Sequence, residues 1–270
     1  MNEHRPCIGV FDSGVGGLSV WRAIERLLPE VPTIYLADQA YCPYGDKSPE
    51  RIAERSLAIA RYLYGQGCRL LVVACNTATA AAIGTLRHIW GGRMPIVGME
   101  PALKPAVLQT QTGHIGLLAT AGTLNGRLFR ETKARFAEHV TVHSCIGHGL
   151  VECVEAGHIQ TPQTMALLAQ YLAPMLSDRI DHLVLGCTHY PFLIPALEEL
   201  LPAGVVVVEP AEAVARQVAR RWRYAIAPQE VTQHRFGSTG QTDALARMLR
   251  TLGRKETPTR VSLTRDGSAR

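Results

Sequence analysis

The sequence predicts an α/β protein with two similar pseudo-symmetric lobes, each a mostly parallel sheet flanked by helices, and an active site in the cleft between them. Two short runs rich in Val and Leu, at residues 70–75 and 182–187, each end in a cysteine. Such runs are typical of parallel strands that are buried on both faces. Each half also begins with an Ile-Gly strand and a Gly-containing turn, at residues 8–14 and 115–123. Because the same units occur twice, we expect two related lobes.

The first half alternates strand and helix patterns, as expected for a doubly wound arrangement. Glycines within residues 14–17 lead into a helix that Pro29 ends. Ser48 is a suitable N-cap, and Pro49 a suitable first residue, for the next long helix. The elements expected in this half are a strand starting at residue 8, a helix to about 28, a strand at 33–37, a helix to about 65, the strand before Cys75, a helix from about 77 that Gly91-Gly92 close, and a short strand at 95–98.

The second half repeats this alternation after a segment at residues 101–105 that crosses between the lobes. We expect strands at 114–119, about 140–145, before Cys187 and, as a buried strand, at 204–208. We expect helices at about 122–138, 150–155, 161–177 and 192–201. The last region is expected to return to the first lobe and holds two amphipathic helices and the strand between them, at about 212–222, 243–252 and 234–240.

These elements predict where the lobes begin and end. The first lobe is expected to comprise residues 1–98 together with about 209–253, and the second lobe residues 99–208. Residues 254–270 form a polar, basic tail with few large apolar side chains. We expect this tail to be disordered.

The composition is typical of a globular protein: 47% of the 270 residues are hydrophobic, and the mean hydropathy is +0.04. The N-terminal residues lack the apolar core of a signal peptide, and no apolar run approaches the roughly 18 to 20 residues of a membrane span. We therefore expect no membrane segment and a cytoplasmic location. The seven cysteines include no CxxC pair, which argues against a disulfide scaffold and a zinc ribbon. We expect free thiols.

The net charge of +5 is unevenly distributed along the chain. Basic residues cluster on one predicted helix and in the tail, at Arg216, Arg220, Arg221, Arg223, Arg254, Lys255, Arg260, Arg265 and Arg270. A surface that binds nucleic acid more often interleaves basic side chains with aromatic ones, and aromatic residues make up only 6% of this chain. We therefore expect solvated surface charge and no nucleic-acid partner.

Two of the cysteines occupy positions suited to chemistry. Cys75 and Cys187 each follow a predicted buried strand and precede a predicted helix. Ligands of parallel sheets bind beyond the carboxyl ends of the strands, and a helix N-terminus favours the thiolate form of a cysteine. The other five are expected to be small buried hydrophobic residues: Cys7, Cys42, Cys68, Cys145 and Cys153.

Neighbouring residues leave three functions open for the cysteine pair. Asp12 ends the first strand, and the glycines after it form a turn suited to an anion or simply to tight packing. A metal site would use Cys75, Cys187 and His189, although no motif spacing supports it. A redox disulfide would require the two α-carbons to approach within about 7 Å. The third function is two-base proton transfer, in which one thiolate removes a proton from one face of a carbon and the other thiol returns one to the opposite face.

Five segments resemble a known family: IGVFDSGVGGLSV, YLADQAYCPYGDKS, VVACNTATA, GLLATAGTL and LVLGCTHYPFL. As a set they are similar to the cofactor-independent glutamate racemases of the aspartate/glutamate racemase superfamily, over about residues 7 to 240. The resemblance implies interconversion of L- and D-glutamate without a cofactor or a metal, with D-glutamate supplied for peptidoglycan synthesis. It also implies a homodimer.

The resemblance assigns roles to individual residues. It implies that Cys75 acts on D-glutamate and Cys187 on L-glutamate, and that Asp12 and His189 assist these thiols and also contact the substrate. The further contacts that it implies to the ammonium and carboxylate groups are Ser13, Tyr44, Gly45, Asn76, Thr77, Thr120 and Thr188.

An acidic residue of the second lobe is harder to match. Glu152, in Leu150-Val151-Glu152, resembles the family's acidic residue there. The family often has Cys-Pro ahead of this segment, whereas this chain has Cys145-Ile146-Gly147-His148-Gly149, so Glu155 is a rival for the role. A racemase acting on aspartate or another amino acid, and an amino-acid-binding regulatory protein without turnover, remain as alternative functions.

Overall fold

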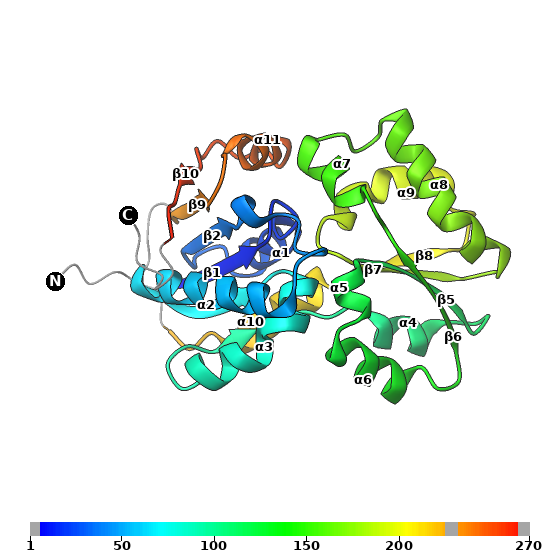
Figure 1. Ribbon diagram of the computed structural model, residues 1–270, viewed down its shortest axis with the longest axis horizontal. Helices are drawn as coiled ribbons and strands as arrows, with labels where there is room; N and C mark the ends of the chain where they lie inside the picture. The colour runs from blue at the N-terminus through cyan, green and yellow to red at the C-terminus, as the bar shows by residue number, and fades with distance from the viewer. Residues whose placement is uncertain (1–5, 225–231, 264–270) are drawn as a thin grey trace.

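The computed structural model describes residues 6–224 and 232–263, which form two parallel sheets with helices on both faces (Figure 1). The first sheet has the strand order β10-β9-β2-β1-β3-β4, and the second the order β6-β5-β7-β8. The strands of the first sheet are β1 Cys7–Asp12, β2 Thr33–Ala37, β3 Cys68–Val73, β4 Ile96–Val97, β9 His234–Ser238 and β10 Thr259–Arg260. Those of the second sheet are β5 His114–Ala119, β6 Thr141–Ile146, β7 His182–Gly186 and β8 Val206–Val208.

The two sheets repeat one topology. The order β2-β1-β3-β4 in the first sheet corresponds to β6-β5-β7-β8 in the second, and every pair of neighbouring strands is parallel. As a result β3 and β7, the strands that precede the two cysteines, hold equivalent places in their sheets. The predicted fold class is confirmed.

The central strand of the first sheet is buried along its whole length. Its alternate residues Ile8 and Val10 share a core with α1 (Leu18–Leu27) and α10 (Ala211–Arg221). Phe11 points to the other face and shares a second core with α2 (Pro49–Gly65) and α3 (Asn76–Trp90). Burying each of these large side chains contributes about 1.5–3 kcal/mol, which holds the strand ends and their functional groups in place.

The second sheet is also covered on both faces. Ile115, Leu117 and Val184 pack with residues of α4 (Leu103–Gln109) and α6 (Arg127–Phe136). Leu183 and Leu185 belong to the large core that also contains β1 residues, so one apolar cluster spans the two sheets. The helices that contribute to this cluster beside the second sheet are α7 Leu150–Ala156, α8 Pro162–Ser177 and α9 Ile194–Leu200.

The C-terminal region returns to the first sheet, as predicted. Strand β9 pairs with β2 from Thr33↔His234 to Ala37↔Ser238, and α11 (Asp243–Thr251) follows it. The prediction of a disordered tail is wrong for residues 254–263. There β10 adds an edge strand to β9, Val261 is buried, and Arg254 pairs with Glu25 and Glu256. The rest of the predicted tail, residues 264–270, lies outside the described residues.

Several helix boundaries differ from the predictions. The expected helix at 122–138 is divided into α5 (Ala121–Leu124) and α6, because Gly126 between them has an extended backbone, with φ −67° and ψ 138°. Gly126 also packs closely on α3, where a Cβ would lie 2.7 Å from that of Ala80. The expected crossing segment at 101–105 begins helix α4, whose Leu103 is fully buried. Short 3₁₀ turns form η1 (Gln39–Tyr41) and η2 (Tyr190–Leu193), the second ahead of α9.

Strand β8 also differs from the prediction. It lies at the edge of the second sheet rather than in a buried position, and Val206 is 48% exposed.

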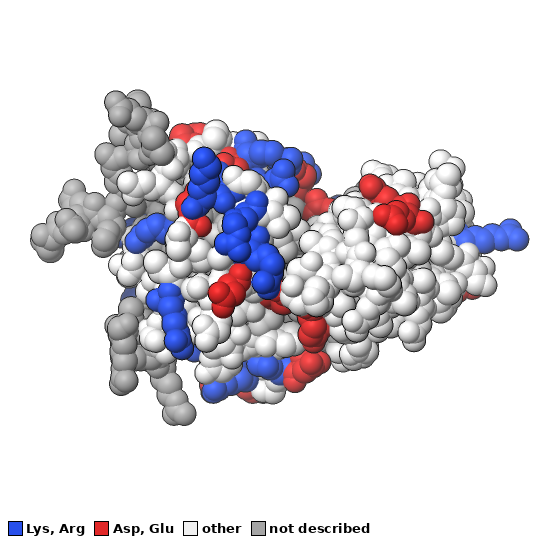
Figure 2. Space-filling view, turned by 90° about the horizontal axis from the view of Figure 1, so that it is seen from above, with Lys and Arg blue, Asp and Glu red and all other residues white. Residues whose placement is uncertain are grey.

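In the described part of the chain, no helix has the length and apolar character needed to span a bilayer. Figure 2 shows Lys and Arg side chains mixed with Asp and Glu over the half of the molecule that contains the first sheet, while the other half is mostly uncharged on this face.

Candidate active site

Cys75 and Cys187 lie just beyond the carboxyl ends of β3 and β7 and line the same small cavity. Both side chains are buried, with Cys75 at 5% and Cys187 at 7% exposure. Cys75 is the N-cap of α3, and its sulfur accepts a hydrogen bond of 3.4 Å from the backbone N–H of Ala78. The two strand ends therefore bring one thiol from each sheet to one site.

Most of the residues that the sequence suggested meet at this cavity, which has a volume of about 20 Å³. The suggested residues that line it are Ser13, Tyr44, Gly45, Cys75, Asn76, Thr77, Thr120, Cys187, Thr188 and His189. Pro43 and Val151 complete the lining. The two suggested residues outside this lining are Asp12, which lies directly behind Cys75, and Glu152.

Asp12 is fully buried at the end of β1 and is held by backbone donors. Its Oδ2 accepts hydrogen bonds from the N–H groups of Gly14 (3.2 Å) and Gly17 (3.0 Å), and its Oδ1 accepts one from the hydroxyl of Thr188 (3.4 Å). Gly17 is required here, since a Cβ at this position would lie 2.6 Å from the Cβ of Asp12.

Asp12 and Cys75 are close enough that each affects the pKa of the other. Burial raises the pKa of Asp12 above its usual value, despite the nearby His189. Burial and the negative charge of Asp12 raise the pKa of Cys75 well above that of an ordinary thiol. Cys75 is therefore a protonated thiol at neutral pH, next to a carboxylate that accepts a proton more readily than an ordinary Asp.

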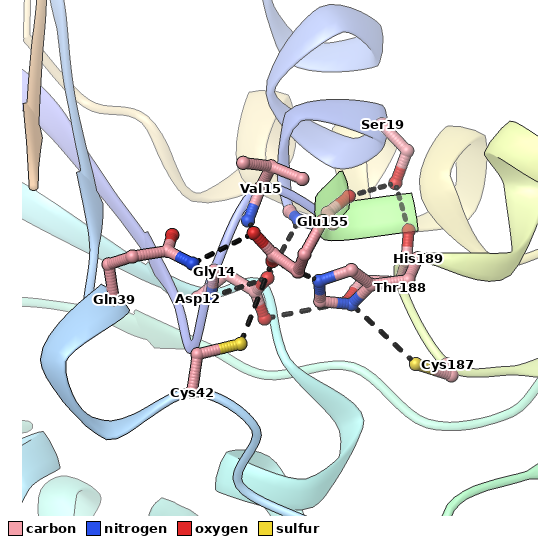
Figure 3. A network of polar contacts seen from close by, with 12 residues as sticks. Asp12, Gly14, Val15, Ser19, Gln39, Cys42, Glu155, Cys187, Thr188 and His189 are labelled. Atoms are coloured by element: carbon pink, nitrogen blue, oxygen red, sulfur yellow. Dashed lines mark hydrogen bonds and ion pairs between the residues drawn. The ribbon is translucent and has the colours of Figure 1, made fainter. Parts of the chain in front are cut away.

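His189 connects the second cysteine to an acidic side chain (Figure 3). Its Nδ1 lies 3.8 Å from Cys187 Sγ, and its Nε2 lies 2.6 Å from Oε1 of Glu155. Burial alone would lower the pKa of His189, but these contacts with Cys187 and Glu155 raise it well above the ordinary value. In Glu155 burial opposes the shift, yet the hydrogen bond from His189 lowers the pKa. The pair is thus an imidazolium and a carboxylate.

Glu155, the rival acidic residue, therefore holds the position beside His189. The backbone N–H of Val15 (2.8 Å) and the Nε2 of Gln39 (2.8 Å) also donate to its carboxylate. Glu152 is exposed and lines a neighbouring cavity of about 40 Å³, together with Thr120. The two glutamates differ because Glu155, three residues further along α7, faces the first sheet across the cleft.

Close packing around these groups depends on glycines in the turn after β1. A Cβ at Gly14 would lie 1.9 Å from Oε1 of Glu155, and a Cβ at Gly16 would lie 2.3 Å from Nδ1 of His189. Any side chain at either position would displace the pair. The Gly-rich turn thus serves as a contact surface for His189 and Glu155, a role that the sequence alone did not indicate.

The loop that carries Tyr44 and Gly45 is anchored by an ion pair that the sequence did not reveal. Arg55 of α2 donates to both carboxylate oxygens of Asp38, at 3.0 and 2.6 Å. The hydroxyl groups of Tyr44 (2.5 Å) and Thr239 (2.7 Å) donate to the same carboxylate. Asp38 thereby links the loop over the cavity to α2 and to the segment after β9.

Polar groups face the cavity from both sheets. The hydroxyls of Thr77 and Thr120 lie 2.8 Å apart and join the N-terminal turns of α3 and α5. The side-chain oxygen and nitrogen of Asn76 are both buried and lack hydrogen-bond partners among the described residues. A buried amide is expected to have such partners, so Asn76 fits a position that contacts a bound polar ligand.

The structure also bears on the other functions considered for the cysteines. All seven are free thiols. Among the described residues, the side chains that converge as potential metal ligands are Cys42, Glu155 and His189, rather than Cys75, Cys187 and His189. The prediction that Cys42 is only a small buried hydrophobic residue is wrong, because this half-buried thiol lies 3.6 Å from Oε1 of Glu155.

Comparison with known proteins identifies the family. The chain matches the model of the family described as Asp/Glu/Hydantoin racemase over residues 8–218. It is 47% identical to the glutamate racemase of Ectopseudomonas mendocina over 92% of this chain and 95% of the relative, and 51% identical to that of Pseudomonas syringae pv. tomato over 79% and 77%. The crystal structure of Escherichia coli glutamate racemase in complex with L-glutamate and the activator UDP-MurNAc-ala superimposes with a TM-score of 0.85, at 35% identity over 96% of this chain and 99% of that one. The chain belongs to the Asp/Glu/hydantoin racemase family.

Proposed function

We propose that this protein interconverts L- and D-glutamate by two-base proton transfer at Cα and so supplies D-glutamate for peptidoglycan synthesis. The observation that carries the proposal is the single cavity lined by Cys75 and Cys187, which follow equivalent strands of two sheets with the same topology. Two thiols approaching from two sheets are suited to serve opposite faces of one carbon. The names of the relatives, all glutamate racemases, support the choice of substrate.

For L-glutamate, Cys187 acts as the base and Cys75 as the acid. The Cys187 thiolate removes the Cα proton, and the Cys75 thiol gives its proton to the opposite face. After the reaction Cys187 is a thiol and Cys75 is a thiolate. The raised pKa of Cys75 supports its starting role as a proton donor. The charged His189 lies beside the sulfur that must carry negative charge.

For D-glutamate the two thiols exchange roles. Asp12 accepts the proton of the Cys75 thiol, a task that its raised pKa favours, and the resulting thiolate attacks the Cα proton. His189 then keeps Cys187 supplied with a proton for the opposite face. In both directions, side chains of the chain itself serve as the acid and as the base. We therefore propose that catalysis uses neither a cofactor nor a metal.

The polar lining is suited to an amino acid with two carboxylates. Asn76 offers an unpaired amide, and the hydroxyls of Thr77 and Thr120 lie at the N-terminal turns of α3 and α5. N-terminal turns present free N–H groups that attract carboxylates. Fixed donors of this kind stabilise the negative charge that develops when the Cα proton leaves. We propose that Ser13, Tyr44, Gly45 and Thr188 complete the contacts.

The size of the cavity implies an opening motion. About 20 Å³ accommodates roughly one water molecule, which is far less than glutamate needs. We propose that residues 1–98 with about 209–253, and residues 99–208, act as two lobes that separate to admit the substrate. The loop at residues 38–47 then covers the bound amino acid and excludes water.

Incubation of the purified protein with L-glutamate in deuterium oxide, without added cofactor, tests the proposal. D-glutamate that carries deuterium at Cα is expected, and chelators should not prevent its formation. Absence of both racemisation and exchange would refute the activity. A panel with aspartate and other amino acids tests the substrate, and binding of glutamate without turnover would instead indicate a regulatory protein.

Two further properties are part of the proposal. We propose a homodimer, which light scattering at two protein concentrations tests, since a monomer at both would refute it. We propose a cytoplasmic location, which the seven free thiols support. Fractionation of cells that express the full chain tests the location.

A further inference from the structure

Three side chains of different chemistry converge on the Nε2 side of His189. Oε1 of Glu155 lies 2.6 Å from His189 Nε2 and 3.6 Å from Cys42 Sγ, and the three potential ligand atoms all lie within 4.8 Å of one another. Sulfur, carboxylate oxygen and imidazole nitrogen are the ligand atoms that proteins use for zinc. We propose that Cys42, Glu155 and His189 bind a thiophilic divalent cation such as Zn²⁺, and that the bound cation inhibits turnover.

The spacing of the three atoms suits a tetrahedral cation. Zinc bonds of about 2.0–2.3 Å place neighbouring ligand atoms roughly 3.3–3.8 Å apart. The separation of 3.6 Å between Cys42 and Glu155 already lies in this range. The separation of 2.6 Å between Glu155 and His189 is shorter because the two atoms share a proton. Replacing this proton by a cation requires the two side chains to part by roughly 1 Å.

The charges of the three groups also suit a divalent cation. Cys42 as a thiolate and Glu155 as a carboxylate bring two negative charges, and a neutral His189 brings none, so the complex is electrically balanced. Binding releases the thiol proton of Cys42 and the Nε2 proton of His189 to solvent. Cys42 and Glu155 are both half-buried, and Figure 3 shows them meeting His189 from separate segments.

A fourth ligand is available next to this cluster. Gln39 donates from Nε2 to the other oxygen of Glu155, at 2.8 Å, while its own Oε1 is buried and lacks a hydrogen-bond partner among the described residues. Rotation of this amide about its last torsion exchanges the nitrogen and the oxygen. The oxygen would then face the cluster as a neutral ligand, and a water molecule is the alternative.

The consequence for turnover rests on the proposed function. A cation on Nε2 replaces the proton that His189 shares with Glu155, so the imidazole beside Cys187 keeps only its Nδ1 proton and loses its positive charge. The cation also binds the Glu155 carboxylate, which otherwise stabilises the charged form of His189. Racemisation should therefore stop while the cation is bound and recover when a chelator removes it. Mg²⁺, which prefers oxygen ligands, should have no such effect.

Cobalt titration tests binding independently of activity. Co²⁺ is added to a Cys75→Ser/Cys187→Ser double variant, in which neither of these thiols is available as a ligand. We expect a thiolate-to-cobalt absorption band in the near ultraviolet that saturates at a single cation per chain. Adding Cys42→Ala or Cys42→Ser should abolish the band, whereas adding Cys145→Ala, a matched change of another half-buried cysteine, should preserve it. The proposal fails if the double variant gives no band or if the band survives both changes at Cys42.

Zinc inhibition of the wild type tests the consequence. Inhibition of each protein is measured relative to its own zinc-free rate. Half-inhibition of Cys42→Ala should need at least roughly 10- to 100-fold more free Zn²⁺ than half-inhibition of the wild type, because changes around a metal site typically lower its affinity by this factor. Equal sensitivity of both proteins would mean that zinc acts on the other thiols and would overturn the inhibitory role. A protein without any racemase activity would refute the proposed function alone, because the cobalt band still decides the cation site.

Discussion

Nε2 of His189 lies 2.6 Å from Oε1 of Glu155, in a partly buried contact between the segment after β7 and helix α7. Glu155 also accepts from the backbone of Val15, so the contact fixes the imidazole against the turn after β1 as well. The carboxylate keeps a proton on His189, whose other nitrogen faces Cys187. Glu155 is therefore expected to act as a positioning residue, through His189 rather than on the substrate.

Replacing Glu155 by Gln tests this role. Glu155→Gln should lower kcat/KM about 10- to 100-fold. This loss is smaller than most effects of removing a general acid or base itself, which are about 100- to 10,000-fold. The alkaline limb of the pH profile should move to lower pH, because His189 loses the carboxylate that raises its pKa. Glu152→Gln is the matched control on the same helix and should change the rate by less than about 2-fold, since an exposed side chain has little effect on its surroundings. A larger effect of Glu152→Gln would contradict the assignment.

The same pair should give stability a defined pH dependence. The pKa of His189 is raised on folding, so its stabilisation is complete below its ordinary value of 6.5 and is lost as the pH rises through the raised value. The pKa of Glu155 is lowered, so its stabilisation is present above 4.5 and is lost as the pH falls through the lowered value. The Tm difference between the wild type and Glu155→Gln should therefore be largest between about pH 4.5 and 6.5. A difference that grows toward alkaline pH would argue against the ion pair.

The Asp38–Arg55 ion pair should matter more for stability than an exposed pair on the same helix. Arg55→Met leaves a fully buried carboxylate without its cation and should cost about 3–5 kcal/mol in urea unfolding. Arg51→Met removes the exposed pair with Glu54 and should cost no more than about 1 kcal/mol. Similar costs for the two changes would show that the buried pair does not anchor the loop.

Local sequence patterns predicted those parts of the structure that local physics determines. Ser48 caps α2 as expected, and Cys75 ends its strand and begins its helix as expected. The contact between Glu155 and His189 was left open because it joins residues of separate elements and depends on how α7 faces the first sheet. Edge strand β10 was missed for a similar reason, since its pairing with β9 depends on tertiary context rather than on its own polar sequence.

The Asp38–Arg55 pair could have been suspected but not placed. Asp38 directly follows a buried strand, and Arg55 interrupts the apolar pattern of α2. Nothing in the sequence says that these two charges are buried together, because Arg is exposed in most helices. The pairing is decided by where α2 packs, which only the assembled sheet defines.

The central claim is that each thiol serves one face of Cα, and single serine variants test it most directly. The probe is 3-chloroglutamate, from which removal of the Cα proton expels chloride from Cβ in one irreversible step. Cys75→Ser and Cys187→Ser should each abolish racemisation of glutamate, because a serine hydroxyl is a poor base at neutral pH. Chloride release should persist with the D-enantiomer in Cys187→Ser and with the L-enantiomer in Cys75→Ser. If both variants prefer the same enantiomer, the two-base account is wrong.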